Sequence, residues 1–212
     1  MPDYDYEADA RPFSRLLSDI GARDEPKLYL GELINAFGER GFGAMMVFLG
    51  LLNALASPIP GSTTVLGAPL LLICLQVLFL RDQLWMPRWA LKSSLPRAEF
   101  RRVTGKVDPL LRRIERISRP RWLVMTTPAA QVLIGLAASL LSLIVMLPIF
   151  GGNLFPSLFV ALFGFGLMQR DGAAVVAAWL GAAGFAAFVW AAWEVISRVF
   201  LATVGWWGHL FG

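Results

Sequence analysis

Two breaks interrupt the long apolar runs of this sequence, one at Ser57-Pro58-Ile59-Pro60-Gly61 and the other at Leu147-Pro148-Ile149-Phe150-Gly151. Proline removes a backbone hydrogen-bond donor and clashes with the preceding helical turn, and glycine adds conformational freedom, so a straight helix cannot continue through either segment. In a membrane, the backbone groups freed by such a break must pair with other protein groups or with water. The breaks therefore predict broken helices that line a cavity or lie buried in a helical bundle.

The composition indicates that these runs lie in a membrane. Of the 212 residues, 57% are hydrophobic and 16% are charged, and the mean hydropathy is +0.61. Soluble domains average about 45–50% apolar and about 25% charged residues. The runs at 122–150, 153–168 and 173–197 have almost no polar face. We predict an all-α, multi-pass membrane protein in which the run 173–197 is a full-length transmembrane helix.

The surroundings of the two breaks indicate an internal duplication. Each break is followed by polar residues, an apolar run and an Arg-Asp pair, so residues 42–82 align with 132–171 at an offset of about 90. We predict two related broken-helix hairpins. Arms of about 16 residues rise about 24 Å, against a hydrocarbon core of about 30 Å. The arms either cross a locally thinned membrane or dip in and return as re-entrant hairpins, and the sequence leaves parallel and inverted arrangements open.

The charges are distributed unevenly along the chain. Residues 1–40 carry five basic and nine acidic side chains, whereas residues 81–121 carry twelve basic and four acidic ones. Because apolar runs flank this basic segment, the positive-inside rule favours a cytoplasmic connector beside anionic headgroups over a nucleic-acid-binding segment. Amphipathic spacing at 13–20 and 97–117 predicts helices in the membrane interface. Residues 1–27 lack the pattern of a cleavable signal peptide.

These patterns divide the chain into five segments. They are an N-terminal polar and amphipathic segment (1–40), a first hairpin repeat (41–82), a basic cytoplasmic amphipathic connector (83–121), a second hairpin repeat (122–172), and a C-terminal transmembrane helix with an aromatic-rich tail (173–212).

The candidate functional residues are polar or helix-breaking groups inside or beside the apolar runs. The hairpin tips are the first place to look for a pathway, at Pro58, Pro60, Gly61, Pro148, Gly151 and Asn153. The pairs Arg81-Asp82 and Arg170-Asp171 are either functional charges at membrane depth or topology anchors at its surface. Glu32 and Glu39 lie either on a solvated helix face or at the mouth of a pathway. The sequence shows no catalytic constellation, no metal-ligand spacing and no cofactor motif.

Several short motifs together resemble the bacterial ExoD family over residues 14–199. They are Gly31-Glu32-Leu33, Gly38-Glu39-Arg40-Gly41-Phe42-Gly43, Ser57-Pro58-Ile59-Pro60-Gly61, Trp85-Met86-Pro87-Arg88, Glu115 with Arg119-Pro120-Arg121, Leu147-Pro148-Ile149 with Asn153 and Pro156, and Arg170-Asp171-Gly172. Phe150 stands where the family often has proline, which makes the second break milder. The resemblance implies a bacterial inner-membrane protein associated with exopolysaccharide production, but it supplies no catalytic residues and no molecular mechanism.

Two functions remain open from the sequence. The first is transport of an ion, a lipid carrier or a glycan precursor, indicated by the two broken helices. The second is a non-transporting scaffold for the polysaccharide synthesis and export machinery, which would bind those proteins through the basic connector. An enzyme is disfavoured because no nucleophile or base is evident. We expect membrane lipids as partners and a homodimer through the Gly- and Ala-rich helix faces, with no nucleic acid.

Overall fold

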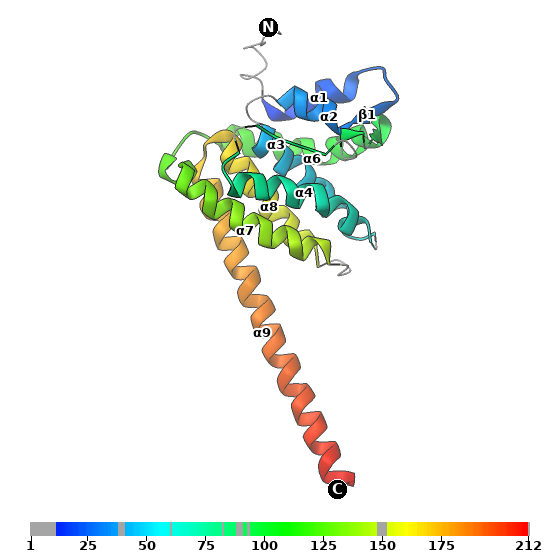
Figure 1. Ribbon diagram of the computed structural model, residues 1–212, viewed down its shortest axis with the longest axis vertical. Helices are drawn as coiled ribbons and strands as arrows, with labels where there is room; N and C mark the ends of the chain where they lie inside the picture. Colours follow the sequence, from blue (N-terminus) through cyan, green and yellow to red (C-terminus); the bar gives the residue numbers. More distant parts are fainter. Residues whose placement is uncertain are drawn as a thin grey trace.

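A computed structural model describes residues 12–37, 41–59, 61–81, 83–87, 91–92, 94–147 and 152–211, with side chains to residue 200. The chain is almost entirely helical (Figure 1). The helices are α1 (Phe13–Ala22), α2 (Leu30–Phe37), α3 (Gly41–Ala56), α4 (Ser62–Leu78), α6 (Arg97–Ile117), η3 (Leu123–Thr126), α7 (Pro128–Met146), α8 (Leu154–Gln169) and α9 (Gly172–Phe211), and the strands are β1 (Lys27–Tyr29) and β2 (Ser94–Pro96).

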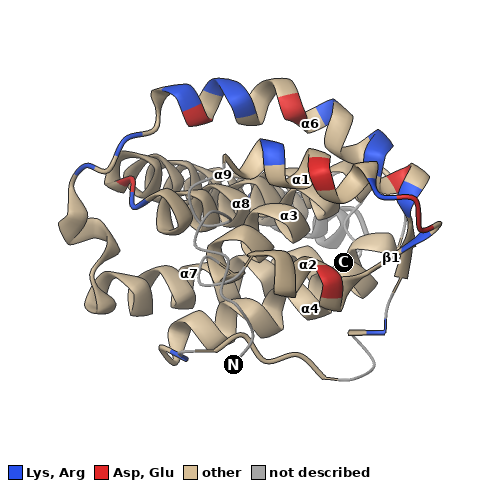
Figure 2. Ribbon diagram, turned by 90° about the horizontal axis from the view of Figure 1, so that it is seen from above, with Lys and Arg blue, Asp and Glu red and all other residues tan. Residues whose placement is uncertain are grey.

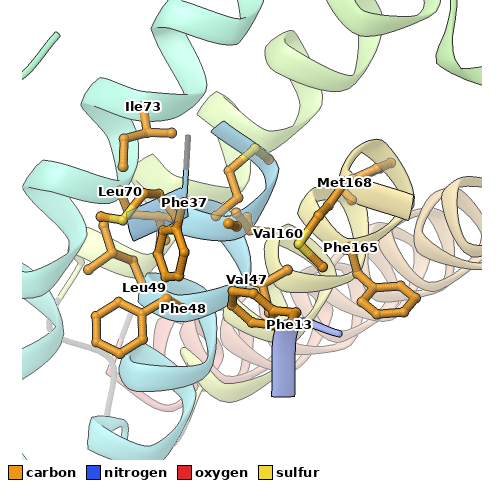
Figure 3. Packing of buried hydrophobic residues seen from close by; sticks show 14 of the residues in the cluster. Phe13, Phe37, Val47, Phe48, Leu49, Leu70, Ile73, Val160, Phe165 and Met168 are labelled. Carbon is orange, nitrogen blue, oxygen red and sulfur yellow. The ribbon is translucent and has the colours of Figure 1, made fainter. Parts of the chain in front are cut away.

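The centre of the fold is a bundle of the four apolar helices that flank the two breaks. α3 packs along α8 and α4 packs along α7, while α3 also contacts α4 and α7 contacts α8. Figure 3 shows buried side chains of three of these helices, among them Phe48, Leu70 and Val160, gathered in one core. The bundle therefore pairs each helix before a break with the helix after the other break.

Glycines allow α3 and α8 to approach each other closely. A Cβ atom on Gly43 would lie 2.6 Å from the carbonyl oxygen of Gly164, and one on Gly50 would lie 2.8 Å from that of Ser157. Residue 43 thus faces residue 164 while residue 50 faces residue 157, so the two helices run antiparallel. Small residues at such contacts let helix backbones pack directly against each other.

A second layer of amphipathic helices covers one side of the bundle (Figure 1). α1 packs on α6, and β1 pairs with β2 in an antiparallel ribbon in which Leu28 is opposite Leu95. α6 has the bounds expected from its amphipathic spacing. Pro109 lies inside this helix, which is continuous through it. Its apolar face is buried through Phe100, Val107 and Leu111, while Figure 2 shows its basic residues along the outer edge of the molecule.

Within the described residues, two helices are long and apolar enough to cross a membrane, namely α7 (Pro128–Met146) and the part of α9 at Gly172–Phe200. The sequence predicted the second of these. α9 projects out of the bundle (Figure 1) and exposes apolar side chains such as Phe188, Trp190 and Trp193. α3, α4 and α8 are apolar but shorter. Large exposed apolar surfaces of this kind need lipid or another protein to cover them.

Candidate functional site

Five polar side chains lie buried in the apolar bundle, next to the breaks. We call them the tip cluster: Asn53, Ser57, Thr63, Asn153 and Ser157. None is more than 5% exposed. They come from the last turn of α3 and the residue after it, the first turn of α4, and the first turn of α8 with its N-cap residue. Buried polar groups of this kind lower stability unless they are hydrogen-bonded.

Asn153 makes the largest set of contacts in the tip cluster. Its Nδ2 donates to Thr63 Oγ1 at 2.8 Å, to the carbonyl oxygen of Val145 at 2.9 Å and to that of Leu147 at 2.8 Å. Ser157 Oγ in turn donates to the carbonyl oxygen of Asn153 at 2.7 Å. The last carbonyl groups of a helix lack partners within it. Asn153 therefore supplies a hydrogen-bond donor to the carbonyl groups at the end of α7, and through Thr63 it joins this end to the start of α4.

Asn53 reaches α4 from the opposite side of the tip cluster. Its Nδ2 donates to the carbonyl oxygen of Leu49 at 2.9 Å and to that of Leu66 at 3.2 Å. Gly50 faces Ser157 across the antiparallel α3–α8 contact. Asn53 lies one turn after Gly50, and Asn153 lies one turn before Ser157, so both asparagines occupy the same level of the bundle.

Three oxygen atoms of the tip cluster are buried without a hydrogen-bond partner among the described residues. They are Asn53 Oδ1, Ser57 Oγ and Asn153 Oδ1. An unpaired buried acceptor costs about 1–3 kcal/mol. Such groups are rare in native structures, and a bound ion or water is one reason for them. Chemically, the cluster can accept hydrogen bonds or coordinate a positive charge.

The structure places the predicted tip residues in two kinds of position. Asn153 lies in the tip cluster. Pro58 and Gly61 lie exposed outside it, and Gly61 takes a left-handed conformation with φ 78° where α4 begins. Pro60, Pro148 and Gly151 lie outside the described residues. The break motifs thus mark the bend, and the polar groups lie at the helix ends beside it.

Sequence reasoning missed Asn53, although a signal was present. Asn53 is the one strongly polar side chain in the apolar run 42–56. Polar residues in membrane helices tend to face the bundle interior. The same rule would have selected Ser157, which lies in the run after the second break.

Among the described charges predicted at the ends of the hairpins, Asp171 makes the most hydrogen bonds. Its Oδ1 accepts from Arg121 Nε at 2.8 Å and from the backbone N–H of Ala173 at 3.0 Å, and its Oδ2 accepts from Ser118 Oγ at 3.1 Å. Burial alone would raise the pKa of this carboxyl. The hydrogen bonds and the positive charge of Arg121 outweigh burial and lower the pKa below its ordinary value. Asp171 therefore ties the start of α9 to the connector.

The other predicted charges at the hairpin ends lie differently. Arg170 and Arg81 are exposed, and Asp82 lies outside the described residues. The ends of α4 and α8 match in backbone geometry: Leu80 has φ 48° and Arg170 has φ 52°. The N–H of Arg81 donates to Gln76 and that of Asp171 to Gly166, each at 3.0 Å. In backbone geometry, position 80 thus corresponds to position 170 and position 81 to position 171. Arg81 therefore corresponds to Asp171 and not to Arg170, so the two Arg-Asp pairs are out of register by one residue.

The charges of the family motifs support the outer layer of helices. Glu32 accepts from Arg97 Nη2 at 3.1 Å and from Arg23 Nη1 at 2.8 Å. Glu115 accepts from the backbone N–H and the hydroxyl of Ser14, at 2.9 and 2.6 Å. Arg121 pairs with Asp171. Arg119 is exposed, and Glu39 and Arg40 lie outside the described residues.

Arg97 is a second residue that sequence reasoning missed. It is 2% exposed, and it donates to the carbonyl oxygens of Ile20, Glu25 and Lys27 as well as to the carboxylates of Glu25 and Glu32. Its position in a basic segment concealed it, because arginines there are usually solvated. Glu32 is therefore part of an ion-pair cluster around the buried Arg97, which favours a structural role over a place at the mouth of a pathway.

Comparison with known proteins agrees with the resemblance seen in the motifs. The family described as "Exopolysaccharide synthesis, ExoD" matches residues 13–191. The chain is 30% identical over 148 residues to an uncharacterized protein of Synechocystis sp. (strain ATCC 27184 / PCC 6803 / Kazusa), covering 69% of this chain and 70% of that protein. It is also 30% identical over 148 residues to Protein ExoD of Rhizobium meliloti (strain 1021), covering 68% of this chain and 61% of that protein.

No solved structure matches the chain. The match to the family covers most of the sequence and includes the tip cluster, Asp171 and Glu115. The chain therefore belongs to the ExoD family, which is linked to exopolysaccharide synthesis.

Proposed function

We propose that the chain is a membrane transport unit that moves a small monovalent cation in support of exopolysaccharide synthesis. The observation that carries this proposal is the tip cluster with its three unpaired buried oxygen atoms. Of the cargoes considered from the sequence, an ion fits this cluster better than a lipid carrier or a glycan precursor, because the polar groups are few and fully enclosed by the bundle.

The chemistry of the tip cluster favours a cation. An asparagine Oδ1 only accepts hydrogen bonds, and both asparagine Nδ2 groups already donate to protein oxygens. The unpaired atoms thus present negative partial charges in an apolar surrounding. Hard cations prefer oxygen ligands of this kind. None of the five side chains is ionisable, so a single positive charge would be easier to hold there than a double one.

The arrangement of the helices supports a membrane-embedded pathway. α7 and α9 have the length of membrane spans, whereas α3 and α8 have 16 residues and α4 has 17. We propose that α3 with α4, and α7 with α8, form two hairpins whose tips meet at the tip cluster, in the bacterial inner membrane. Broken helices that meet inside the membrane are a recurring way to build ion sites in transporters, often within duplicated halves.

Flux in proteoliposomes tests the proposal. Purified chain should raise the uptake of Na⁺ or K⁺ down an imposed gradient above that of protein-free liposomes. Asn53→Leu and Asn153→Leu should each lower this uptake at least tenfold. Ser139→Ala is the matched control, because Ser139 is buried but bonds only within its own helix, to Gly135. Uptake no greater than in protein-free liposomes would reject transport of these ions.

A scaffold for the polysaccharide synthesis and export proteins is the second candidate function. The observation in its favour is the outward basic face of α6, which includes the exposed residues Arg112, Arg113 and Arg116 (Figure 2). Cross-linking in cells should then capture synthesis or export subunits, and charge reversal at these three arginines should abolish the capture.

We also propose a homodimer along α7. This helix exposes leucines at alternating spacings of three and four residues, at Leu133, Leu136, Leu140 and Leu143. Such a seam is the pattern of left-handed helix pairs. Cysteine cross-linking at Leu136 and Leu140 between copies in native membranes tests it, with the exposed Leu180 of α9 as the control position.

A further inference from the structure

We propose that the groove between α1 and α6 binds the phosphate group of an anionic membrane lipid. The groove has a volume of about 610 Å³. It is lined by Pro12, Ser14, Arg15, Ser18, Asp19, Arg112, Glu115 and Arg116. This site is distinct from the tip cluster, and the inference does not rest on transport.

The acidic side chains of α6 beside the groove are already engaged. Both carboxylate oxygens of Glu115 accept hydrogen bonds from Ser14. Asp108 forms an ion pair with Arg112, in which Oδ2 lies 2.8 Å from Nε. Arg116 forms no ion pair within the described part of the chain. Asp19 is the acidic group on the α1 side.

The positive charge continues beyond the first groove. A second groove of about 550 Å³ shares Arg112 and Arg116 with the first and adds Arg113. Three guanidinium groups thus lie within two turns of α6, with the hydroxyl of the exposed Ser18 across the first groove. Arginine binds phosphate with paired N–H donors, and hydroxyl groups supply further donors. The two grooves together suit a phosphate-bearing ligand.

The residues that follow α6 decide which phosphate-bearing ligand fits. Beyond Ile117 the chain passes through the exposed apolar residues Trp122, Leu123 and Val124, which are 62%, 56% and 73% exposed, and then enters the span-length helix α7 at Pro128. Tryptophan beside a span marks the level of the lipid headgroups. Arg112, Arg113 and Arg116 lie six to ten residues before Trp122. They would meet the phosphates of the cytoplasmic leaflet, where anionic lipids attract basic segments. A soluble phosphate has no apolar part that could contact Trp122, Leu123 and Val124, whereas a lipid has acyl chains.

Native mass spectrometry of the full chain in a neutral detergent tests the proposal. The probes are phosphatidylglycerol, phosphatidylcholine with the same acyl chains, and inorganic phosphate. Wild type should bind phosphatidylglycerol at least tenfold more tightly than phosphatidylcholine. Arg112→Gln with Arg116→Gln should weaken phosphatidylglycerol binding at least tenfold, because it removes the paired N–H donors that line the groove.

Two further double variants separate binding from folding. Arg102→Gln with Lys106→Gln removes the same charge from exposed positions of α6 outside both grooves, and it should keep wild-type binding. Arg112→Lys with Arg116→Lys keeps the charge and should bind between wild type and the glutamine variant. Equal binding of the two lipids, equal loss in the control, or displacement of phosphatidylglycerol by an equal concentration of inorganic phosphate would each overturn the proposal.

Discussion

Asn153 Nδ2 donates a hydrogen bond of 2.8 Å to Thr63 Oγ1, between residues ninety positions apart in the sequence. A second bond beside it runs from Thr64 Oγ1 to the carbonyl oxygen of Met146 at 2.9 Å. These contacts join the start of α4 to the end of α7 and the start of α8. The two breaks therefore lie at the same end of the bundle.

Asn153→Leu should destabilise the fold much more than Thr63→Val. Leucine leaves Thr63 Oγ1 and the carbonyl oxygens of Val145 and Leu147 without their shared donor, and each unpaired buried group costs about 1–3 kcal/mol. Valine at position 63 leaves the Asn153 amide two other acceptors, so about 1 kcal/mol is expected. Unfolding in mixed micelles measures both changes. A double variant whose loss equals the sum of the two single losses would show that the pair is not coupled.

The shared position of the two breaks also predicts their accessibility. In a Cys74→Ser background, Ile59→Cys and Leu147→Cys should react with a membrane-impermeant thiol reagent from the same side of the membrane. Both native side chains are exposed, at 61% and 52%. Labelling of the two positions from opposite sides would contradict the bundle as described. A cysteine at Asn53, which is 0% exposed, should react slowly from either side and serves as the buried control.

Asp171→Asn should lower stability at neutral pH and flatten its acid dependence. The folded-state pKa of Asp171 lies below its ordinary value of 3.8. The ionised carboxylate therefore stabilises the fold above that value, and the contribution is lost as the pH falls through the lower folded-state pKa. Asparagine can still cap α9 but cannot pair its charge with Arg121, so a loss of about 1 kcal/mol is expected at pH 7.

The control for this pH dependence is Asp108→Asn. Asp108 pairs with Arg112 on the exposed face of α6, and exposed pairs contribute about 0–1 kcal/mol. The free energy of unfolding of each variant is measured from pH 7 down to pH 3. A constant difference between Asp171→Asn and wild type over this range would show that the carboxylate does not stabilise the fold through its charge.

Much of the architecture was predictable because helix breaks and apolar length are local properties. Pro58 and Gly61 predicted the bend before α4, the run 173–197 predicted α9, and the amphipathic spacing predicted α6. The family followed from short motifs in a fixed order. These inferences needed no knowledge of which helices touch.

The residues that sequence reasoning missed depend on contacts between distant segments. Arg97 is buried only because α1, the β1–β2 ribbon and α2 close around it. Asn53 lies at the level of Asn153 only because Gly50 lets α3 pack directly on α8. The Arg-Asp pairs indicated the wrong register between the two repeats for a related reason. The left-handed turn that ends each helix falls on Leu80 and on Arg170, so backbone geometry, and not the charges, is what the two helix ends have in common.

Arg97→Leu should destabilise the outer layer by about 3 kcal/mol, because it leaves three backbone carbonyl groups without this donor and Glu32 with Arg23 alone. Arg97→Lys keeps the charge but has fewer donors in a different geometry, so an intermediate loss is expected. Arg102→Leu, at an exposed position of the same helix, should change stability by no more than about 0.5 kcal/mol. Unfolding of α1 and α6 is followed by hydrogen exchange. Equal effects at positions 97 and 102 would contradict the buried cluster.

Gly164→Ala should weaken the contact between α3 and α8. An added Cβ would lie 2.5 Å from Met46 Cβ and 2.7 Å from the carbonyl oxygen of Gly43, so the helices must separate, at about 1–3 kcal/mol. Gly105→Ala is the control, because a Cβ there meets nothing within 4 Å, and alanine in a helix interior should gain about 0.5–1 kcal/mol. The opposite signs make the comparison decisive. If both variants are stabilised, the two helices are not held at backbone contact. The inference that Asn53 and Asn153 occupy the same level of the bundle then fails as well.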